Sequence, residues 1–312
     1  MNWSEDALLS KAKIYFEKAN TEDKDSMFFG MYSALGMELL ARAAVAHISP
    51  ALLADPSNYT NLLYALNLKD DDCNPKSIMT NKVIALCGVL VPEFNTDLQK
   101  VATLMTERRN EELHTGGGGF AEYNVDDWLA DYYKVCQVLG SFLGETLETL
   151  FGKDVAKEAE EIIAEVAEKV MKAVRDKISA RKKTYEEDKV NNPEEIEKLI
   201  ISAKANMFAK THAGFHKVAC PCCGNDAVIF GKESDNSHET IEGDEVRVVK
   251  EVNANTFQCG VCKLHLSSYA ELKAAGLPLH YTNTYYYDPT EFFGIDVDSM
   301  VAEGFIEEYS NE

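Results

Sequence analysis

Five of the eight cysteines lie between residues 220 and 262, and four of these form two Cys-x-x-Cys pairs. The first pair is Cys220 and Cys223, followed by Gly224, and the second pair is Cys259 and Cys262. A tight turn in each pair directs two thiolates to one point, and two pairs separated by a strand-rich insert supply the ligands of a tetrahedral zinc ion. The spacing therefore predicts a closed structural zinc site, since a catalytic zinc keeps one position open.

The residues around the two pairs resemble zinc ribbons, with CPxCG at the first knuckle and FQCGVCKLHL at the second. We expect Gly224 to permit the first turn and Gly260 to relieve crowding in the second. Cys222 lies between two ligands and is expected to be a spectator. His216 and His265 lie near enough to replace a thiolate, but a complete set of four cysteines leaves them no role. Zinc would then fold the ribbon without indicating a function.

A second group of residues with chemical potential is the sequence RNEELH, which contains Arg109, Asn110 and His114 and comes just before four glycines at 116–119. RNA cleavage without a metal needs a group that moves protons near neutral pH, for which histidine is suited. It also needs a cation that stabilises charge on the phosphorane, for which arginine is suited. The amide of Asn110 can position either group. Arg108 is an alternative to Arg109, which we prefer because Asn110 follows it.

The helix expected to carry these residues limits how they can meet. Asn110 and His114 are four residues apart and share a helix face, whereas Arg109 and His114 lie about 140° apart round the helix. One copy of the chain does not bring these two together, but two copies facing across a two-fold axis would, which predicts a homodimer. The alternative interpretation is a surface ion-pairing arginine and a histidine that suits the negative end of the helix.

The Arg-x4-His motif, with a polar residue directly after the arginine, resembles the ribonucleases of the HEPN superfamily over about residues 1–150. This resemblance implies a helical bundle, a dimer, and a metal-independent endoribonuclease with an RNA substrate, of the kind found among toxins and antiviral-defence effectors. Its catalytic residues would be Arg109, Asn110 and His114, and attack by the 2′-hydroxyl would leave a cyclic phosphate. Two other hypotheses remain. One is a non-catalytic HEPN and zinc-ribbon module for binding or dimerisation in a regulatory complex, and the other is a zinc-ribbon regulator of the transcription or translation machinery.

The elements that must position these residues are predicted to be mainly helical. We expect a helical bundle, then a long charged helix that packs on its neighbours or forms a dimer arm, then a small β-rich ribbon. The predicted helices are residues 5–19, 27–47, 59–66, 76–90, 94–113, 125–150, 153–190 and 194–208, and the predicted strands are 227–230 and 245–252. The corresponding domains are the HEPN-like region 1–151, the long helix and connector 152–212, the zinc ribbon 213–273, and an acidic extension 274–312 of short irregular pieces.

Composition limits the partners and the location. The 312 residues carry 31 basic and 52 acidic side chains, and a net charge of −21 excludes general electrostatic attraction to polyanions. Residues 151–219 carry 14 basic and 13 acidic side chains and are the least unfavourable place for RNA. With no membrane-length apolar run and no secretory signal, we expect a cytoplasmic protein without a membrane partner. The isolated cysteines are expected to be reduced core residues.

Overall fold

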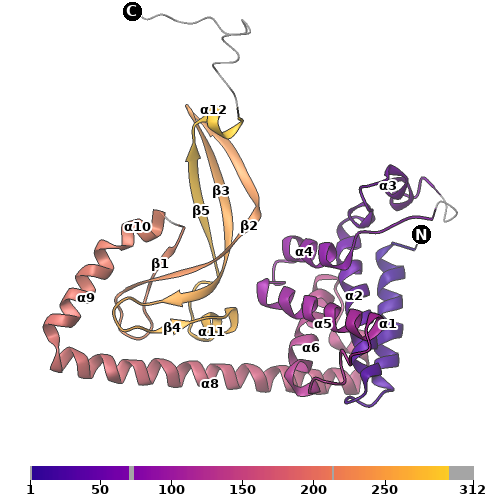
Figure 1. Cartoon of the computed structure of the whole chain (residues 1–312), viewed down its shortest axis with the longest axis horizontal. Coiled ribbons are helices and arrows are strands. Elements are labelled where there is room, and N and C mark those ends of the chain that lie inside the picture. Colours follow the sequence, from indigo (N-terminus) through magenta and orange to yellow (C-terminus); the bar gives the residue numbers. More distant parts are fainter. Residues whose placement is uncertain (1, 70–73, 213, 295–312) are drawn as a thin grey trace, which may run out of the picture. The chain divides into compact units, whose positions relative to one another are not determined.

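The computed structural model describes residues 2–69, 74–212 and 214–294, and the chain forms two compact units (Figure 1). The first unit is Met1–Arg175 and the second is Asp176–Glu312. The boundary lies inside the long helix α8 (Lys153–Asn191), so each unit contains part of that helix. Every helix of the described residues is too short or too polar to cross a membrane.

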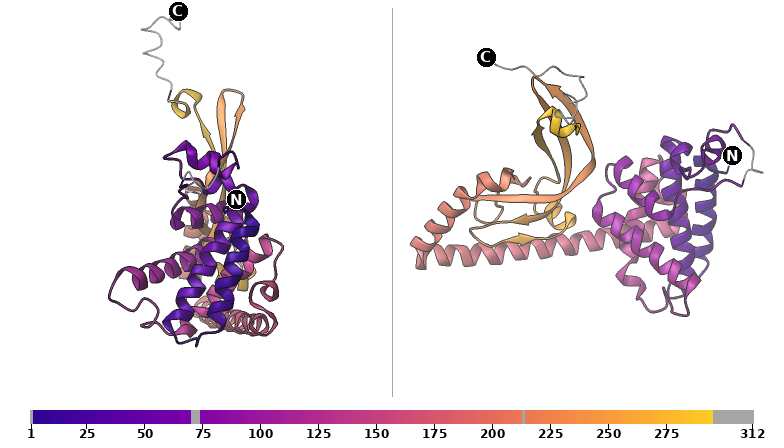
Figure 2. Two further views of the ribbon diagram at one scale, coloured as in Figure 1. Left: turned by 90° about the vertical axis from the view of Figure 1, so that its right-hand side faces the viewer. Right: turned by 45° about the horizontal axis from the view of Figure 1, so that its top comes forward.

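The first unit is a packed group of helices around α2, which contacts α1, α4, α5 and α6. Figure 2 shows α1 and α2, in indigo and violet, side by side. The elements are α1 (Glu5–Asn20), α2 (Met27–Ile48), η1 (Pro50–Leu53), α3 (Tyr59–Ala65), α4 (Thr80–Leu90), α5 (Thr96–His114), η3 (Val125–Asp127), α6 (Leu129–Phe142), α7 (Leu147–Phe151) and the start of α8. Large buried side chains fill the core between them, including Phe16, Met37, Leu40, Phe94, Met105, Tyr132 and Leu139.

Local signals explain where the central helices begin and end. The side chain of Ser26 accepts a hydrogen bond from the first turn of α2, and the side chain of Asn95 accepts two from the first turn of α5. Helix α5 ends at His114, directly before Thr115 and the four glycines, which would be costly inside a helix. The predicted helices 5–19, 27–47 and 94–113 are confirmed to within two residues at each end.

Two other predicted helices are wrong in part. The helix predicted at 76–90 begins only at Thr80, because the backbone of Ser77 pairs with Ala54 in an isolated antiparallel bridge. The helix predicted at 125–150 is divided into η3, α6 and α7. The break between α6 and α7 contains Gly144, whose φ of +75° places it in the left-handed region.

Helix α8 confirms the long helix predicted at 153–190. Its first turns bury Ala156 and Ala159 in the core of the first unit, and Tyr185 near its other end is buried in the core of the second. Exposed side chains on this helix are typified by Glu165 and Lys169, which form an ion pair at 2.7 Å one turn apart.

The second unit is an antiparallel sheet with short helices around it (Figure 1). Strands β2 and β3 form a long hairpin, β1 pairs with the first part of β2, and both β4 and β5 pair with β3. The elements after α8 are α9 (Pro193–Ala205), α10 (Met207–His212), β1 (His216–Ala219), β2 (Asp226–Glu242), β3 (Glu245–Gln258), β4 (His265–Leu266), α11 (Tyr269–Ala274), β5 (His280–Tyr287) and α12 (Pro289–Phe292).

The sheet is larger than predicted. The predicted strands 227–230 and 245–252 are the first parts of the longer β2 and β3. The prediction of irregular structure after residue 274 is wrong for residues 280–287. These residues form β5 and pair with residues 246–253 of β3. Tyrosine occupies both faces of this strand, so its sequence lacks the alternation of apolar and polar residues that indicates a strand. The rest of the extension, 295–312, lies outside the described residues.

Candidate metal centre and candidate active site

The four predicted metal ligands come together in the second unit. The sulfurs of Cys220, Cys223, Cys259 and Cys262 all lie within 4.8 Å of one another. The Sγ atoms of Cys220 and Cys262 are 3.5 Å apart, and those of Cys223 and Cys259 are 3.6 Å apart. A tetrahedral ion with metal–sulfur bonds of about 2.3 Å requires sulfur–sulfur distances of about 3.8 Å. The cluster is therefore positioned to bind a metal ion and is consistent with a zinc ribbon.

The two cysteine turns repeat the same backbone hydrogen bonds. In the first turn the N–H of Gly224 donates to the carbonyl of Cys220 at 3.0 Å, and in the second the N–H of Lys263 donates to the carbonyl of Cys259 at 3.2 Å. Gly224 and Lys263 both follow the second cysteine of their pair, with φ of +71° and +62°. The expected role of Gly224 is confirmed, since the turn requires this left-handed conformation.

The expected role of Gly260 is wrong. A Cβ atom at this position would lie 3.6 Å from the side chain of Ala203, an ordinary van der Waals contact, and φ is not in the left-handed region. The residue under conformational strain in the second turn is Lys263. Its Nζ donates to the carbonyl of Gly260 at 2.6 Å.

The neighbours of the cluster have roles other than metal binding. Cys222 is buried and its backbone N–H donates to the sulfur of Cys220 at 3.4 Å. His216 stacks on the ring of Tyr281 with centroids 4.9 Å apart, and His265 lies at an exposed position of β4, so neither histidine belongs to the cluster.

A helix outside the predicted ribbon supports the first cysteine turn. The side chain of Asn225 donates to the hydroxyl of Tyr185 on α8 at 3.1 Å. The backbone carbonyl of Asn225 accepts from the N–H of Cys220 at 2.9 Å. The sequence did not indicate Tyr185, because only the fold brings α8 beside the first turn.

Helix α5 carries the second set of predicted residues. The side chain of Arg109 is 13% exposed, and its Nη1 donates to Oε2 of Glu38 on α2. The side-chain oxygen of Asn110 accepts from Nη2 of Arg109 at 2.8 Å and from Nε at 3.2 Å. The structure thus brings Arg109 and Asn110 together, with the amide orienting the guanidinium.

His114 lies apart from this pair. It is the last residue of α5, its side chain is exposed, and it has no hydrogen-bond or ion-pair partner among the described residues. Within one chain the structure does not place the imidazole against Arg109, in agreement with their angular separation of about 140° on a helix. It does not place the imidazole against Asn110 either, although these two residues share a helix face.

Glu38 is the centre of a network that the sequence did not reveal. One of its oxygens accepts from Nε of Arg42 at 3.0 Å and from the hydroxyl of Thr80 at 2.7 Å, and the other accepts from Arg109. Burial alone would raise the pKa of Glu38, but the Thr80 hydrogen bond and the two guanidinium charges outweigh it and hold the pKa below the usual range. A usable signal was present: Glu38 and Arg42 are the only Asp, Glu, Lys or Arg residues of α2, one helical turn apart.

Arg108 is in a different environment from Arg109. It is 6% exposed, and its guanidinium carbon lies 3.8 Å from the ring centroid of Tyr123. Its Nε and Nη1 are buried without a hydrogen-bond partner among the described residues, and burial lowers the pKa of this guanidinium. Tyr123 therefore covers the guanidinium of Arg108, which leaves Arg109 as the arginine nearer to solvent.

The four glycines do not form a uniformly loose turn. A Cβ atom on Gly119 would lie 2.1 Å from the carbonyl oxygen of Arg108, so only glycine allows the loop to pack this closely on α5. The N–H of Phe120 then donates to the carboxylate of Glu112 at 3.2 Å. Gly116, at the other end of the run, has nothing within 4 Å of such an atom. The loop after α5 is thus packed against the helix at residues 119–120 and has open space around residue 116.

Comparison of the chain with protein-family models, with curated proteins and with solved structures finds no match in any of the three.

Proposed function

We propose that this protein is a HEPN-type endoribonuclease that cleaves RNA without a catalytic metal and carries a structural zinc ion in its second unit. The observation that carries the proposal is the orientation of Arg109. Glu38 and Asn110 hold its guanidinium near the end of α5, five residues before the exposed imidazole of His114. An oriented cation and an accessible proton carrier are the two groups that metal-free RNA cleavage requires.

In the proposed reaction, His114 accepts the proton of a ribose 2′-hydroxyl as that oxygen attacks the adjacent phosphorus. The bond from phosphorus to the 5′-oxygen then breaks, and the departing oxygen takes a proton from an imidazolium. The products are a 2′,3′-cyclic phosphate and a 5′-hydroxyl end. Arg109 stabilises the additional negative charge on the phosphorane, and Asn110 keeps the guanidinium in place.

A second copy of the chain supplies the groups that one copy cannot bring together. Arg109 and His114 point about 140° apart on one helix, so the proposed site combines α5 from two copies.

The proposed ion is zinc, because tetrahedral four-cysteine sites are characteristic of structural zinc. A pocket beside the second cysteine turn supports RNA contact by the ribbon. Its volume is about 370 Å³, and it is lined by Lys210, Lys263 and His265 with no carboxylate among the described lining residues. A cytoplasmic toxin or antiviral-defence effector acting on cellular or invading RNA is the corresponding role.

The test is cleavage of a pool of transfer and messenger RNA in EDTA, with a zinc-replete sample to control for loss of the ribbon metal. The catalytic variants are Arg109→Ala and His114→Ala. The matched controls are Arg108→Met, which changes the covered neighbouring arginine, and His47→Ala, which changes another histidine near a helix end, where it is paired with Glu5.

We expect cyclic phosphate ends from the parent chain and from both controls, and a loss of at least about 100-fold in the two catalytic variants. Equal cleavage by all five proteins would contradict the assignment of the site. Loss of cleavage in Arg108→Met alone, with folding intact, would assign the stabilisation of the phosphorane to Arg108 instead of Arg109.

One observation favours a non-catalytic alternative. The charge of Arg109 is already neutralised by Glu38, and His114 is not in contact with it. This arrangement would also suit a dimerisation or binding module in a regulatory complex. Sedimentation together with the cleavage assay distinguishes the two, because the module predicts a dimer that remains inert toward RNA and is unaffected by His114→Ala.

A further inference from the structure

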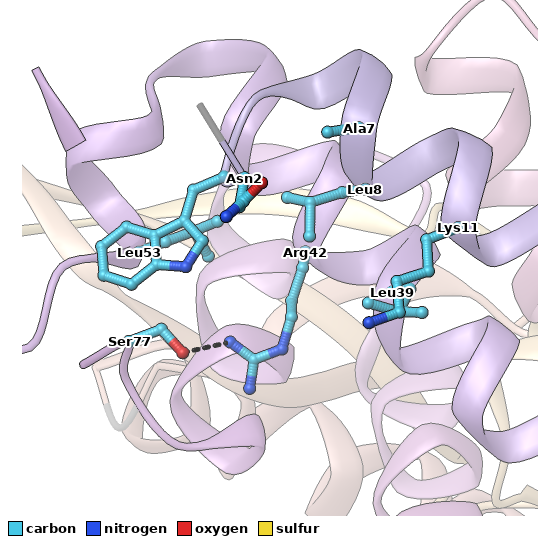
Figure 3. Close-up of a pocket in the computed structure, with 9 residues that line it drawn as sticks. Asn2, Ala7, Leu8, Lys11, Leu39, Arg42, Leu53 and Ser77 are labelled. Atoms are coloured by element: carbon cyan, nitrogen blue, oxygen red, sulfur yellow. Dashed lines mark hydrogen bonds between the residues drawn. The ribbon is translucent and has the colours of Figure 1, made fainter. Parts of the chain in front are cut away.

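A cavity of about 400 Å³ lies in the first unit, between α1, α2, η1 and the segment before α4 (Figure 3). It is separate from the residues of α5. Residues from the start of the chain also line the cavity, and the indole of Trp3 forms one wall. This volume falls within the range of pockets that hold small organic ligands.

The charged lining of the cavity has one sign. Its ionisable side chains are Lys11 and Arg42, and no carboxylate is among the described lining residues, although acidic side chains outnumber basic ones 52 to 31 in the chain. Lys11 is exposed on α1 and forms no ion pair with any described residue. Lys11 is therefore available to an anion.

Arg42 is fixed in place before any ligand arrives. Its Nη1 donates to the hydroxyl of Ser77 and to the carbonyl of Ile78, each at 3.2 Å, and its side chain is 13% exposed. Figure 3 shows the bond to Ser77 at the cavity. These bonds are longer than the common 2.9 Å, so an anionic oxygen would make a stronger contact.

The carboxylate beside Arg42 is shared with a second arginine outside the cavity. Glu38 serves both Arg42 and Arg109, so the three side chains together carry one net positive charge. Arg109 does not line the cavity, so the unpaired positive charge at the cavity is that of Lys11, beside an Arg42 whose carboxylate is shared with Arg109. An anion bound there would contact Lys11 and would share Arg42 with Glu38.

Apart from Asn2, the rest of the cavity wall is apolar. Leu8, Leu39 and Leu53 line it, and Trp3 packs edge-on against Tyr64 with ring centroids 4.9 Å apart. A fixed indole with leucines beside it suits a flat apolar group.

We propose that this cavity binds a small organic anion that carries a flat apolar group. The anionic group lies against Lys11 and Arg42, and the flat group lies against Trp3 and the leucines. The proposal does not depend on RNA cleavage, and its test measures binding alone, so either proposal can fail without the other.

The experiment is calorimetric titration of the full chain with phenyl phosphate, with tryptophan fluorescence as a second signal. Trp3 lines the cavity, whereas the only other tryptophan, Trp128, is 5% exposed in the core. The test variant is Lys11→Gln, an exposed change that leaves the core intact, and its matched control is Lys18→Gln on the same helix.

We expect saturable binding of phenyl phosphate that quenches the tryptophan fluorescence. Lys11→Gln should weaken this binding about tenfold, which is the loss expected for one hydrogen bond to a charged group. Lys18→Gln should leave the affinity unchanged. Phenol, which lacks the anion, and inorganic phosphate, which lacks the ring, should each bind at least about tenfold more weakly. No saturable binding of phenyl phosphate up to about 10 mM would overturn the proposal. Equal affinity for Lys11→Gln, or for phosphate without the ring, would do the same.

Discussion

At the scale of single residues, Glu38 matters most in the first unit because it holds two guanidinium groups at once. We expect Glu38→Gln to lower the free energy of unfolding of this unit by about 3 kcal/mol at pH 7, since the two buried cations would lose their carboxylate. Urea unfolding followed by tryptophan fluorescence measures this, because Trp3 and Trp128 both lie in the first unit.

The effect should depend on pH in a definite direction. The pKa of Glu38 in the folded chain lies below its ordinary value of 4.5, so its contribution is complete above that value and is lost as the pH falls through the folded pKa. The difference between the parent and Glu38→Gln should therefore be smaller at an acidic pH below the folded pKa than at pH 7. Glu17→Gln, an exposed change on α1, serves as the control, and an equal difference at both pH values would contradict the role given to Glu38.

The sequence predicted part of this site for a clear reason. Asn110 directly follows Arg109, so the contact between these two residues is local. The spacing of Arg109 and His114 correctly indicated that a single helix would not bring them together. Glu38 and Thr80 could not be predicted, because they come from other helices and reach Arg109 only through the packing of α2, α4 and α5. The proposed catalytic roles of all these residues remain predictions.

At the scale of elements, the glycine run after α5 provides two substitutions with opposite expectations. Gly119→Ala would force a Cβ atom against the backbone of Arg108, and we expect a loss of about 2 kcal/mol or more in unfolding free energy. Gly116→Ala has open space around it, so the unfolding free energy should stay the same or rise by about 0.5 kcal/mol. Urea titration of both variants decides the matter, and similar effects of the two would mean that residues 119–120 are not packed against α5.

The two cysteine turns provide a second comparison between elements. Lys263 adopts a left-handed conformation that glycine adopts without strain, so Lys263→Gly should stabilise the metal-loaded second unit by about 0.5–1 kcal/mol. Gly224→Ala should destabilise it by about 1 kcal/mol for the same reason, and Gly260→Ala should change little. Calorimetric melting of the metal-loaded protein measures all three. A destabilising Lys263→Gly would show that the lysine side chain stabilises the turn more than its backbone strains it.

At the scale of the whole molecule, the two units have separate cores, and only the second contains the cysteine cluster. Removing the metal with a strong chelator should therefore unfold the ribbon and leave the first unit folded. Hydrogen exchange is the suitable measurement: amides of β2 and β3 should lose protection, while those of α2 and α6 keep it. Cys259→Ser should behave as the chelated protein does and Cys222→Ser as the parent, and retained protection of β3 without metal would contradict a structural role for the ion.

The sequence predicted the global division into helices followed by a sheet that holds the cysteine cluster, because helical periodicity and cysteine spacing are local patterns. It did not predict the extent of the sheet. The polar stretch of β2 around residue 237 and the tyrosines of β5 become strands only through their pairing with β3. The tyrosines and threonines of β5 favour a strand, but neither segment alternates between apolar and polar residues, so contacts between distant segments decide these elements.

The pairing of β5 with β3 has a consequence for synthesis on the ribosome. Both cysteine pairs emerge before residues 280–287, so the ribbon can bind its metal while the edge of β3 at 246–253 is still open. An open strand edge invites pairing with other nascent chains, and charged side chains are a common protection against it. Arg247, Lys250 and Glu251 lie on this edge. They would keep neighbouring chains on a polysome apart until each chain supplies its own β5.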